Sequence, residues 1–213
     1  WPLITTKLYL DQTGDLDFLL RDQVYFRDHL HHRCQRQDPD WAPGSGIQHY
    51  TRTGEVVQGS ILEHLLVQHL TAFFNVGEHN LIRLEGGDWN DGLDMAAERG
   101  ESVAFSAMYA GNLRALSSLC ENLIEFGVTE VPLAVELLPL LDRILGPVDY
   151  DSIVAKQEHL QAYFDLVQGN LSGEKRSLPL SEMAADLNAK SDWLAGQINN
   201  QEWVVDGEGQ AWF

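Results

Sequence analysis

The chain has 213 residues, of which 44% are hydrophobic and 22% are charged, as in a folded domain with a sizeable core. Its formal net charge of −18 repels nucleic-acid phosphates and anionic membrane surfaces, so we expect neither as a partner. No apolar run reaches the length of a membrane-spanning helix. Cys34 and Cys120 lie far apart and Cys120 falls in an apolar helical pattern, which predicts a buried free thiol and a reducing, cytoplasmic location.

The first part of the chain is dominated by the spacing of apolar residues that is typical of helices. Leucines from Leu3 to Leu20, followed by Val24 and Phe26, predict two helices joined at residues 13–15. Gly14 suits the end of the first helix and Asp15 the start of the second. Residues 34–58 then break the pattern with prolines and glycines, which predicts a long loop, and such loops are often functional.

The helical pattern returns after this loop and continues almost to the end of the chain. We predict further helices after Ser60, over residues 102–126, over 131–145 with Pro132 in the first turn and Pro139 as a kink, over 152–167 and over 181–198. Strand signals are weak apart from residues 203–205. The fold class is therefore predicted as all-α. Helices of uneven length joined by alternating short and long loops favour a toroid of helical hairpins.

The segment over residues 84–94 is the most informative part of the chain. It packs four carboxylates, one amide, three glycines and Trp89 between two long helical patterns. Breaking a glycosidic bond requires a carboxylic acid beside the leaving oxygen, with a pKa raised by burial or by nearby negative charge. Asp88, Asp91 and Asp94 are close enough for that effect, and Trp89 offers a flat apolar face to a sugar ring. A solvated acidic turn around a buried tryptophan is the alternative.

The sequence fits no standard metal-binding pattern. A calcium loop that starts at Asp88 fails at its fifth, sixth and twelfth positions, so no calcium site and no other metal site is expected. The histidines and cysteine of residues 29–34 match no standard zinc spacing, and His64 and His69 are five residues apart, so they share no helical face. Glu55 and Glu63 are predicted to be surface charges.

The run Gly-Gly-Asp-Trp-Asn-Asp-Gly, residues 86–92, resembles the signature of the inverting β-glucan phosphorylases, a glycosyltransferase family 36 type whose best-known members are cellobiose phosphorylases. The likeness extends to Trp1-Pro2-Leu3, Thr13-Gly14-Asp15, Glu63-His64 and Gly100-Glu101-Ser102-Val103. It is strong up to about residue 116 and weak over 128–200. Gly92-Leu93-Asp94-Met95 departs from the commonest cellobiose version, which leaves the linkage of the substrate open.

The resemblance implies a fold, a reaction and a set of site residues. Residues 1–213 would be part of an (α/α)6 barrel catalytic domain, truncated at both ends. Phosphate would attack the anomeric carbon of a β-linked gluco-oligosaccharide with inversion and release α-glucose 1-phosphate. Asp91 would be the general acid, Asp88 an orienting residue or alternative acid, and Trp89, Asn90 and Arg83 substrate contacts. Arg83 would otherwise pair with Glu85 or a helix end.

The same resemblance implies what the chain requires from elsewhere. No cofactor is expected, because inorganic phosphate is a co-substrate. The Arg and Asp that grip the sugar would precede Trp1 and the phosphate-binding elements would follow Phe213, so the isolated chain is expected to be inactive. An inverting hydrolase on the same fold and a non-catalytic carbohydrate-binding module remain alternatives. The assembly state stays open, a homodimer included.

Overall fold

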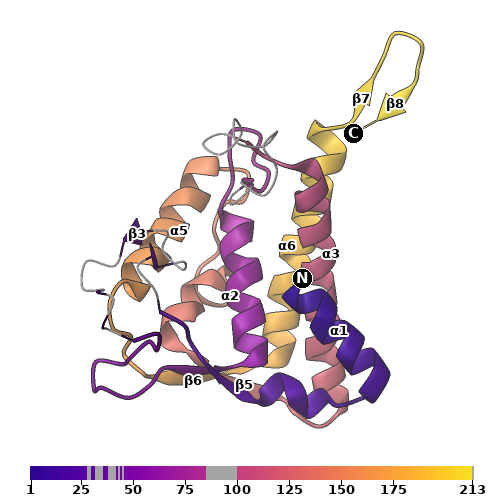
Figure 1. Cartoon of the computed structure of the whole chain (residues 1–213). Coiled ribbons are helices and arrows are strands. Elements are labelled where there is room, and N and C mark those ends of the chain that lie inside the picture. Colours follow the sequence, from indigo (N-terminus) through magenta and orange to yellow (C-terminus); the bar gives the residue numbers. More distant parts are fainter. Residues whose placement is uncertain are drawn as a thin grey trace.

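The computed structural model describes residues 1–27, 30–31, 36–37, 42, 44, 46–84 and 100–212 (Figure 1). The chain is mostly helical, as predicted. The main helices are α1 (Pro2–Thr13), α2 (Ile61–Phe74), α3 (Val103–Glu125), α5 (Ile153–Val167) and α6 (Leu180–Gln201). A short α4 (Asp142–Leu145) and the 3-10 helices η1 (Leu16–Leu20) and η4 (Val135–Leu140) connect them.

Three of the helices begin at serines that cap them. The hydroxyls of Ser60, Ser102 and Ser152 accept the backbone N–H three residues further on, at 3.1 to 3.2 Å, and so satisfy a donor that the first turn leaves free. Gly14 ends α1 in the left-handed conformation, with φ of 68°, and donates its N–H to Leu10 O at 2.8 Å. The predicted helix starts after residues 60, 102 and 152 and the predicted end of α1 are confirmed.

Short antiparallel strand pairs accompany the helices, and most of them were not predicted. They are β1 (Asp22–Val24) with β4 (Gln58–Ser60), β2 (Leu30–His31) with β3 (Arg36–Gln37), β5 (Glu130–Ala134) with β6 (Lys175–Pro179), and β7 (Val204–Val205) with β8 (Ala211–Trp212). The β7–β8 pair contains the strand expected near residues 203–205 and extends away from the helices in Figure 1.

Two predicted helices are wrong. Residues 131–145 form β5, η4 and α4 in succession, because Val131 and Leu133 alternate with outward-facing residues and pair across to Leu178 and Arg176 of β6. The second helix predicted over residues 16–26 is only η1, and the chain then becomes extended as β1 because it pairs with β4. In both places, pairing with a distant strand overrides a local apolar pattern.

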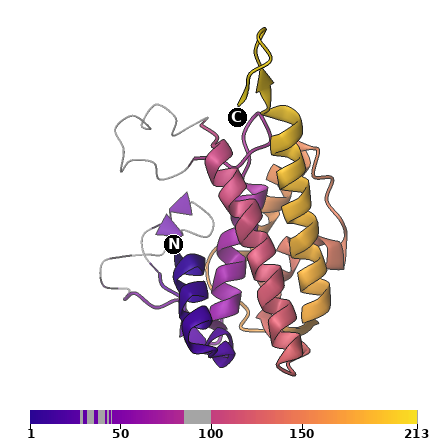
Figure 2. The ribbon, with the colours of Figure 1, turned by 90° about the vertical axis from the view of Figure 1, so that its right-hand side faces the viewer.

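Helices α3 and α6 run antiparallel and side by side (Figures 1 and 2). Ser117 Oγ donates to Ala184 O at 3.0 Å near one end of the pair, and Ser191 Oγ donates to Ala110 O at 2.8 Å further along. Helix α2 lies beside them and contributes many of the buried side chains, including Leu62, Leu66, Leu70 and Phe73. Each such side chain contributes about 1.5–3 kcal/mol when it is buried.

Cys120 lies on the buried face of α3 as a free thiol, as predicted, and burial raises its pKa to about 12. Within the described ranges, no helix combines the length and the apolar character needed to cross a bilayer.

Candidate functional site

The acidic segment, residues 84–94, lies in the chain between α2 and α3. Residues 85–99 lie outside the described residues, and the predictions for Asp88, Trp89, Asn90 and Asp91 fall there. The structure does describe the residues on either side, 75–84 and 100–102, which we call the loop stem.

The two sides of the loop stem are joined by an isolated antiparallel bridge. Leu84 N donates to Gly100 O at 2.8 Å, and Ser102 N donates to Ile82 O at 3.1 Å. Arg83 and Glu101 face each other in an antiparallel bridge. Paired strands lie about 4.8 Å apart, so the residues flanking the acidic segment are held close together.

Glu101 closes the turn on the other side of the stem. Its carboxylate accepts His79 N at 2.9 Å and Leu81 N at 2.8 Å, so a residue after the acidic segment holds the turn before it. Gly77 leaves room for Glu101 at this turn, because a Cβ added there would lie 2.5 Å from Glu101 Cδ and force that side chain to shift. Asn80 adopts a φ of 59°, which asparagine tolerates better than most residues.

The stem is also tied to three helices. Ser106 of α3 accepts Ile82 N with its hydroxyl at 2.9 Å. From α5, Gln157 Nε2 donates to Val76 O at 3.1 Å, and from α6, Gln197 Nε2 donates to His79 O at 3.0 Å. A loop that carries chemistry needs a rigid support, and this stem provides one.

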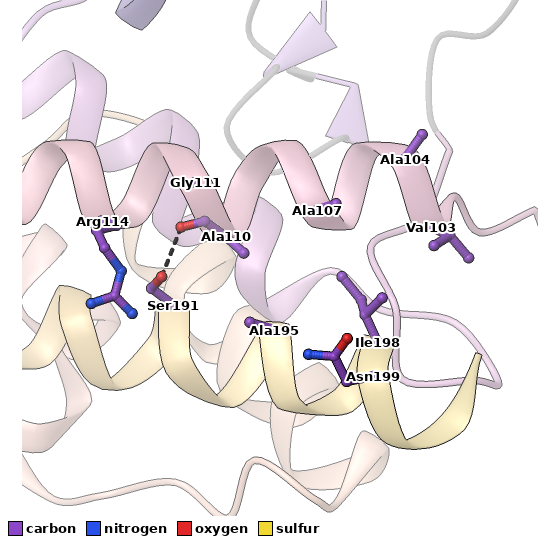
Figure 3. Close-up of a pocket in the computed structure, with 10 residues that line it drawn as sticks. All are labelled: Val103, Ala104, Ala107, Ala110, Gly111, Arg114, Ser191, Ala195, Ile198 and Asn199. Carbon is purple, nitrogen blue, oxygen red and sulfur yellow. Dashed lines mark hydrogen bonds between the residues drawn. The ribbon is translucent and has the colours of Figure 1, made fainter. Parts of the chain in front are cut away.

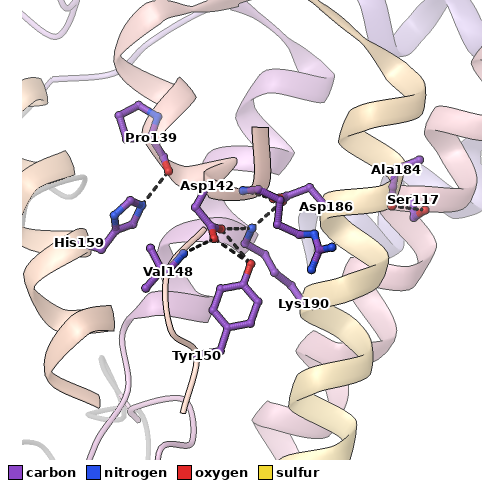
Figure 4. Close-up of polar contacts among 10 residues, drawn as sticks. Ser117, Pro139, Asp142, Val148, Tyr150, His159, Ala184, Asp186 and Lys190 are labelled. Carbon is purple, nitrogen blue, oxygen red and sulfur yellow. Dashed lines mark hydrogen bonds and ion pairs between the residues drawn. The ribbon is translucent and has the colours of Figure 1, made fainter. Parts of the chain in front are cut away.

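A buried ionic cluster fixes α6 against the segment before α5 (Figure 4). Lys190 Nζ donates to Asp142 Oδ1 at 2.5 Å and to Asp186 Oδ2 at 2.6 Å. Tyr150 OH donates to the same Asp142 carboxylate at 2.9 Å. Burial raises the pKa of Asp186, which Lys190 partly counteracts, and burial together with the Asp142 charge raises the pKa of Tyr150. Such a fully bonded cluster favours one arrangement of its helices.

An acidic hollow of about 500 Å³ borders the stem. Its lining contains the carboxylates of Glu78, Glu101 and Glu202 together with His79. His79 Nδ1 lies 3.0 Å from Glu202 Oε1. This hydrogen bond and the negative charge of Glu202 raise the pKa of His79. Carboxylates accept hydrogen bonds from hydroxyl groups and repel phosphate, so the hollow suits a neutral polyol better than an anion.

A larger groove of about 790 Å³ runs between α3 and α6 (Figure 3). Small and apolar residues dominate its lining, and Arg114 is the charged residue among them. With no carboxylate in its lining, the groove has no group that can protonate a leaving oxygen.

The structure places the other residues that the sequence singled out. Arg83 lies in the stem, half-buried, directly before the acidic segment; its predicted partner Glu85 lies outside the described residues. His69 is buried, with Nδ1 2.7 Å from Leu65 O and Nε2 3.2 Å from Asn112 Nδ2. His64 instead stacks on the Tyr25 ring, at 3.9 Å between centroids. Among the described residues, no three histidine, cysteine or acidic side chains are grouped as metal ligands.

The prediction that Glu63 is a surface charge is wrong, whereas Glu55 is exposed as expected. Glu63 is 0% exposed, and its carboxylate accepts Tyr25 OH at 2.7 Å and Ala134 N at 2.9 Å. Both partners are distant in sequence, so no local pattern could have revealed them. Sequence reasoning also missed the roles of Asn80 and Glu101, although Glu101 falls in a segment that carries the family resemblance.

Comparison with known proteins bears directly on this part of the chain. Residues 36–125 match the catalytic domain of the glycosyl hydrolase 94 superfamily. By this match, residues 36–125 belong to that superfamily's catalytic domain. The matched part contains α2, the loop stem, the acidic segment and α3. The resemblance to inverting phosphorylases is thus supported independently.

A curated relative gives the same indication. The solabiose phosphorylase of Paenibacillus borealis is 30% identical over 151 residues, which is 70% of this chain. The aligned part is 16% of that relative's length. The chain is therefore similar to a small part of a much longer glycoside phosphorylase.

Proposed function

We propose that this chain supplies the general acid of a glycoside phosphorylase that cleaves β-linked gluco-oligosaccharides with inversion. The observation that carries the proposal is the superfamily match, which spans the acidic segment and its stem. The likeness to a solabiose phosphorylase favours phosphorolysis over hydrolysis, and it leaves the sugars and their linkage to be determined.

In the proposed reaction, Asp91 donates its proton to the glycosidic oxygen while the bond from that oxygen to the anomeric carbon breaks. An oxygen of inorganic phosphate forms the new bond on the opposite face of the sugar. The products are a shortened acceptor with a free hydroxyl and α-glucose 1-phosphate. Phosphate is itself the nucleophile, so no second carboxylate is needed to activate water.

The neighbours of Asp91 take supporting roles in this proposal. Trp89 offers an aromatic face to a sugar ring and removes water from the acid, which raises the pKa of a carboxyl group. Asp88 orients the site or serves as an alternative acid, and Asn90 contacts substrate. Arg83 is a substrate contact at the foot of the segment, where the stem fixes its backbone.

The described charges suggest which ligand meets this side of the site. Glu78, Glu101 and Glu202 line the hollow beside the stem, and the whole chain carries a net charge of −18. These charges favour sugar hydroxyls and disfavour phosphate. We propose that the phosphate-binding groups are supplied mainly by parts of the protein other than residues 1–213.

We also propose a wider architecture for the protein. The mostly helical chain, in which α3 runs antiparallel to both α2 and α6, would form part of an (α/α)6 barrel, and residues 1–213 would be one portion of that catalytic domain. A cytoplasmic location fits the buried free thiol of Cys120. A homodimer remains a proposal that sedimentation of the complete protein would test.

The reaction is tested by incubating the complete protein with β-linked gluco-oligosaccharides and following products by phosphorus NMR. We expect α-glucose 1-phosphate to form only when phosphate is present. Release of free sugar at the same rate without phosphate would instead indicate an inverting hydrolase, whose paired carboxylates lie roughly 6.5–9.5 Å apart. Binding without turnover under either condition would indicate a carbohydrate-binding module.

A further inference from the structure

Lys156 of α5 is a fully buried lysine whose hydrogen-bond partner belongs to the loop stem. Its side chain is 0% exposed, and Nζ donates to Asn80 Oδ1 at 3.1 Å. The ammonium lies 3.6 Å from the centroid of the Trp193 ring and 4.4 Å from that of Phe73. Two aromatic faces and one amide oxygen thus surround this charge.

This environment differs from that of the other buried lysine. Lys190 is paired with two carboxylates, whereas Lys156 makes no ion pair among the residues that the structure describes. A buried charge without an ionised partner is costly, and an apolar side chain of similar volume would pack in its place at less expense. A lysine at this position therefore has a role beyond filling space in the core.

That use is suggested by what Lys156 holds. Asn80 is buried at the tip of the stem turn, in the left-handed conformation. Its Nδ2 donates to Tyr150 O at 2.9 Å and to Asp151 O at 3.3 Å, and its Oδ1 accepts from Lys156. Lys156 thus fixes the orientation of the amide, and the amide connects the stem turn to the segment before α5.

We propose that Lys156 is a positioning residue for the acidic segment. It holds the side chain of Asn80, and through Asn80 it fixes the stem that precedes residues 85–99. The link to catalysis rests on the proposed function, whereas the effect on the stem does not. The role requires a charged Lys156, because a charged donor makes a stronger hydrogen bond to an amide oxygen than a neutral one.

The charged groups facing Lys156 determine when it is charged. Burial lowers the pKa of Lys156 to about 7; Asp151 raises it and Lys190 of α6 lowers it further. Around Lys190 lie Asp142, Asp186 and Tyr150. The stem is therefore expected to loosen as the pH rises past about 7.

The direct test is hydrogen exchange at the stem amides of Leu81, Ile82 and Leu84 in the complete protein. Lys156→Met removes the charge at similar volume, and the matched control Lys175→Met changes a partly exposed lysine on β6, which pairs with Asp22 at 3.7 Å. We expect Lys156→Met to speed exchange at these amides about tenfold or more, as for loss of a charged hydrogen bond. Unchanged stem protection, or equal loss of protection throughout the core, would overturn the proposal.

A second variant changes a charge next to Lys156 with little change in side-chain shape. Asp151→Asn retains an oxygen for Trp193 Nε1, which donates to Asp151 Oδ1 at 2.8 Å, and removes the negative charge that raises the pKa of Lys156. In the unmodified protein, protection of the stem amides, corrected for intrinsic exchange, should fall as the pH rises. In Asp151→Asn the same fall should have its midpoint at a lower pH. An identical midpoint in both proteins, or no pH dependence in the unmodified protein, would overturn the proposal.

Steady-state kinetics of the same variants test the link to catalysis. We expect Lys156→Met to lower kcat about tenfold or more with less change in KM, and Lys175→Met to leave both unchanged. Loosened stem amides together with an unchanged kcat would overturn the link to catalysis. The proposed function fails separately, if the unmodified protein produces no sugar phosphate, and the exchange results are independent of that outcome.

Discussion

Glu101 accepts the backbone N–H of Leu81 at 2.8 Å, and this contact joins the residues that precede the acidic segment to those that follow it. The same carboxylate accepts His79 N, and the backbone of Glu101 bridges to Arg83. The positions at which the segment leaves and returns are therefore set by the fold around it. The two ends of the segment that carries the proposed general acid are therefore held in place by the stem.

The close approach of Gly77 to Glu101 gives the first prediction. Gly77→Ala would place a Cβ 2.5 Å from Glu101 Cδ, so the carboxylate must move away from its two amides. We expect a loss of about 1–3 kcal/mol in the free energy of unfolding, as for other overpacked sites, and a lower kcat in the complete protein. Gly196→Ala in α6 is the control: its Cβ would meet nothing within 4 Å, and it should stabilise by about 0.5–1 kcal/mol. Equal effects of the two substitutions on urea unfolding would contradict this reading.

The buried carboxylate of Glu63 gives the second prediction. Glu63→Ala leaves Tyr25 OH and Ala134 N without their acceptor and opens a cavity, so we expect a loss of about 2–4 kcal/mol. Tyr25→Phe removes one of these bonds and should cost about 0.5–1.5 kcal/mol. Chemical denaturation measures both. If Glu63→Ala lowers the free energy of unfolding no more than Glu55→Ala, a substitution at an exposed residue, the buried role assigned to Glu63 is wrong.

The buried histidine of α2 gives a pH-dependent prediction. Burial lowers the pKa of His69 to about 4, mainly because the charged ring would lose its water, while its bond to Leu65 O opposes the shift. The folded protein therefore favours neutral His69. Its contribution is fully present above the unfolded pKa of about 6.5 and is lost as the pH falls toward 4.

We expect the free energy of unfolding to fall by on the order of 2–3 kcal/mol between pH 7.5 and pH 4.5 on account of His69. His69→Gln cannot titrate and can still bond to Leu65 O or Asn112, so it should lack this part of the pH dependence. Urea unfolding at the two pH values measures the difference. The same slope in both proteins would show that other groups cause it.

Local signals in the sequence predicted the helix boundaries well where a single side chain sets them. Ser60, Ser102 and Ser152 cap their helices with bonds that reach only three residues, so the relevant chemistry lies within a few positions. Residues 131–145 show the limit of such signals. Their apolar spacing suits a helix, yet Val131 pairs with Leu178, a partner that only the folded chain brings near.

The candidate site shows the same division. The acidic segment was recognised from its composition and spacing, and the superfamily match includes it. The network that supports it was not predicted, because Asn80, Glu101 and Lys156 act on partners from separate helices and turns. The prediction of Glu63 as a surface charge is wrong for the same reason, since its partners Tyr25 and Ala134 come from distant parts of the chain.

The most direct test of the account is the turnover number of Asp91→Asn in the complete protein, measured as phosphate-dependent release of sugar 1-phosphate. Asparagine keeps the shape of the side chain and cannot donate the proton, so we expect kcat to fall about 10²–10⁴-fold. Asp88→Asn, the matched change three residues earlier, should cost less. Activity of Asp91→Asn within about twofold of the unmodified protein would contradict the assignment of the general acid.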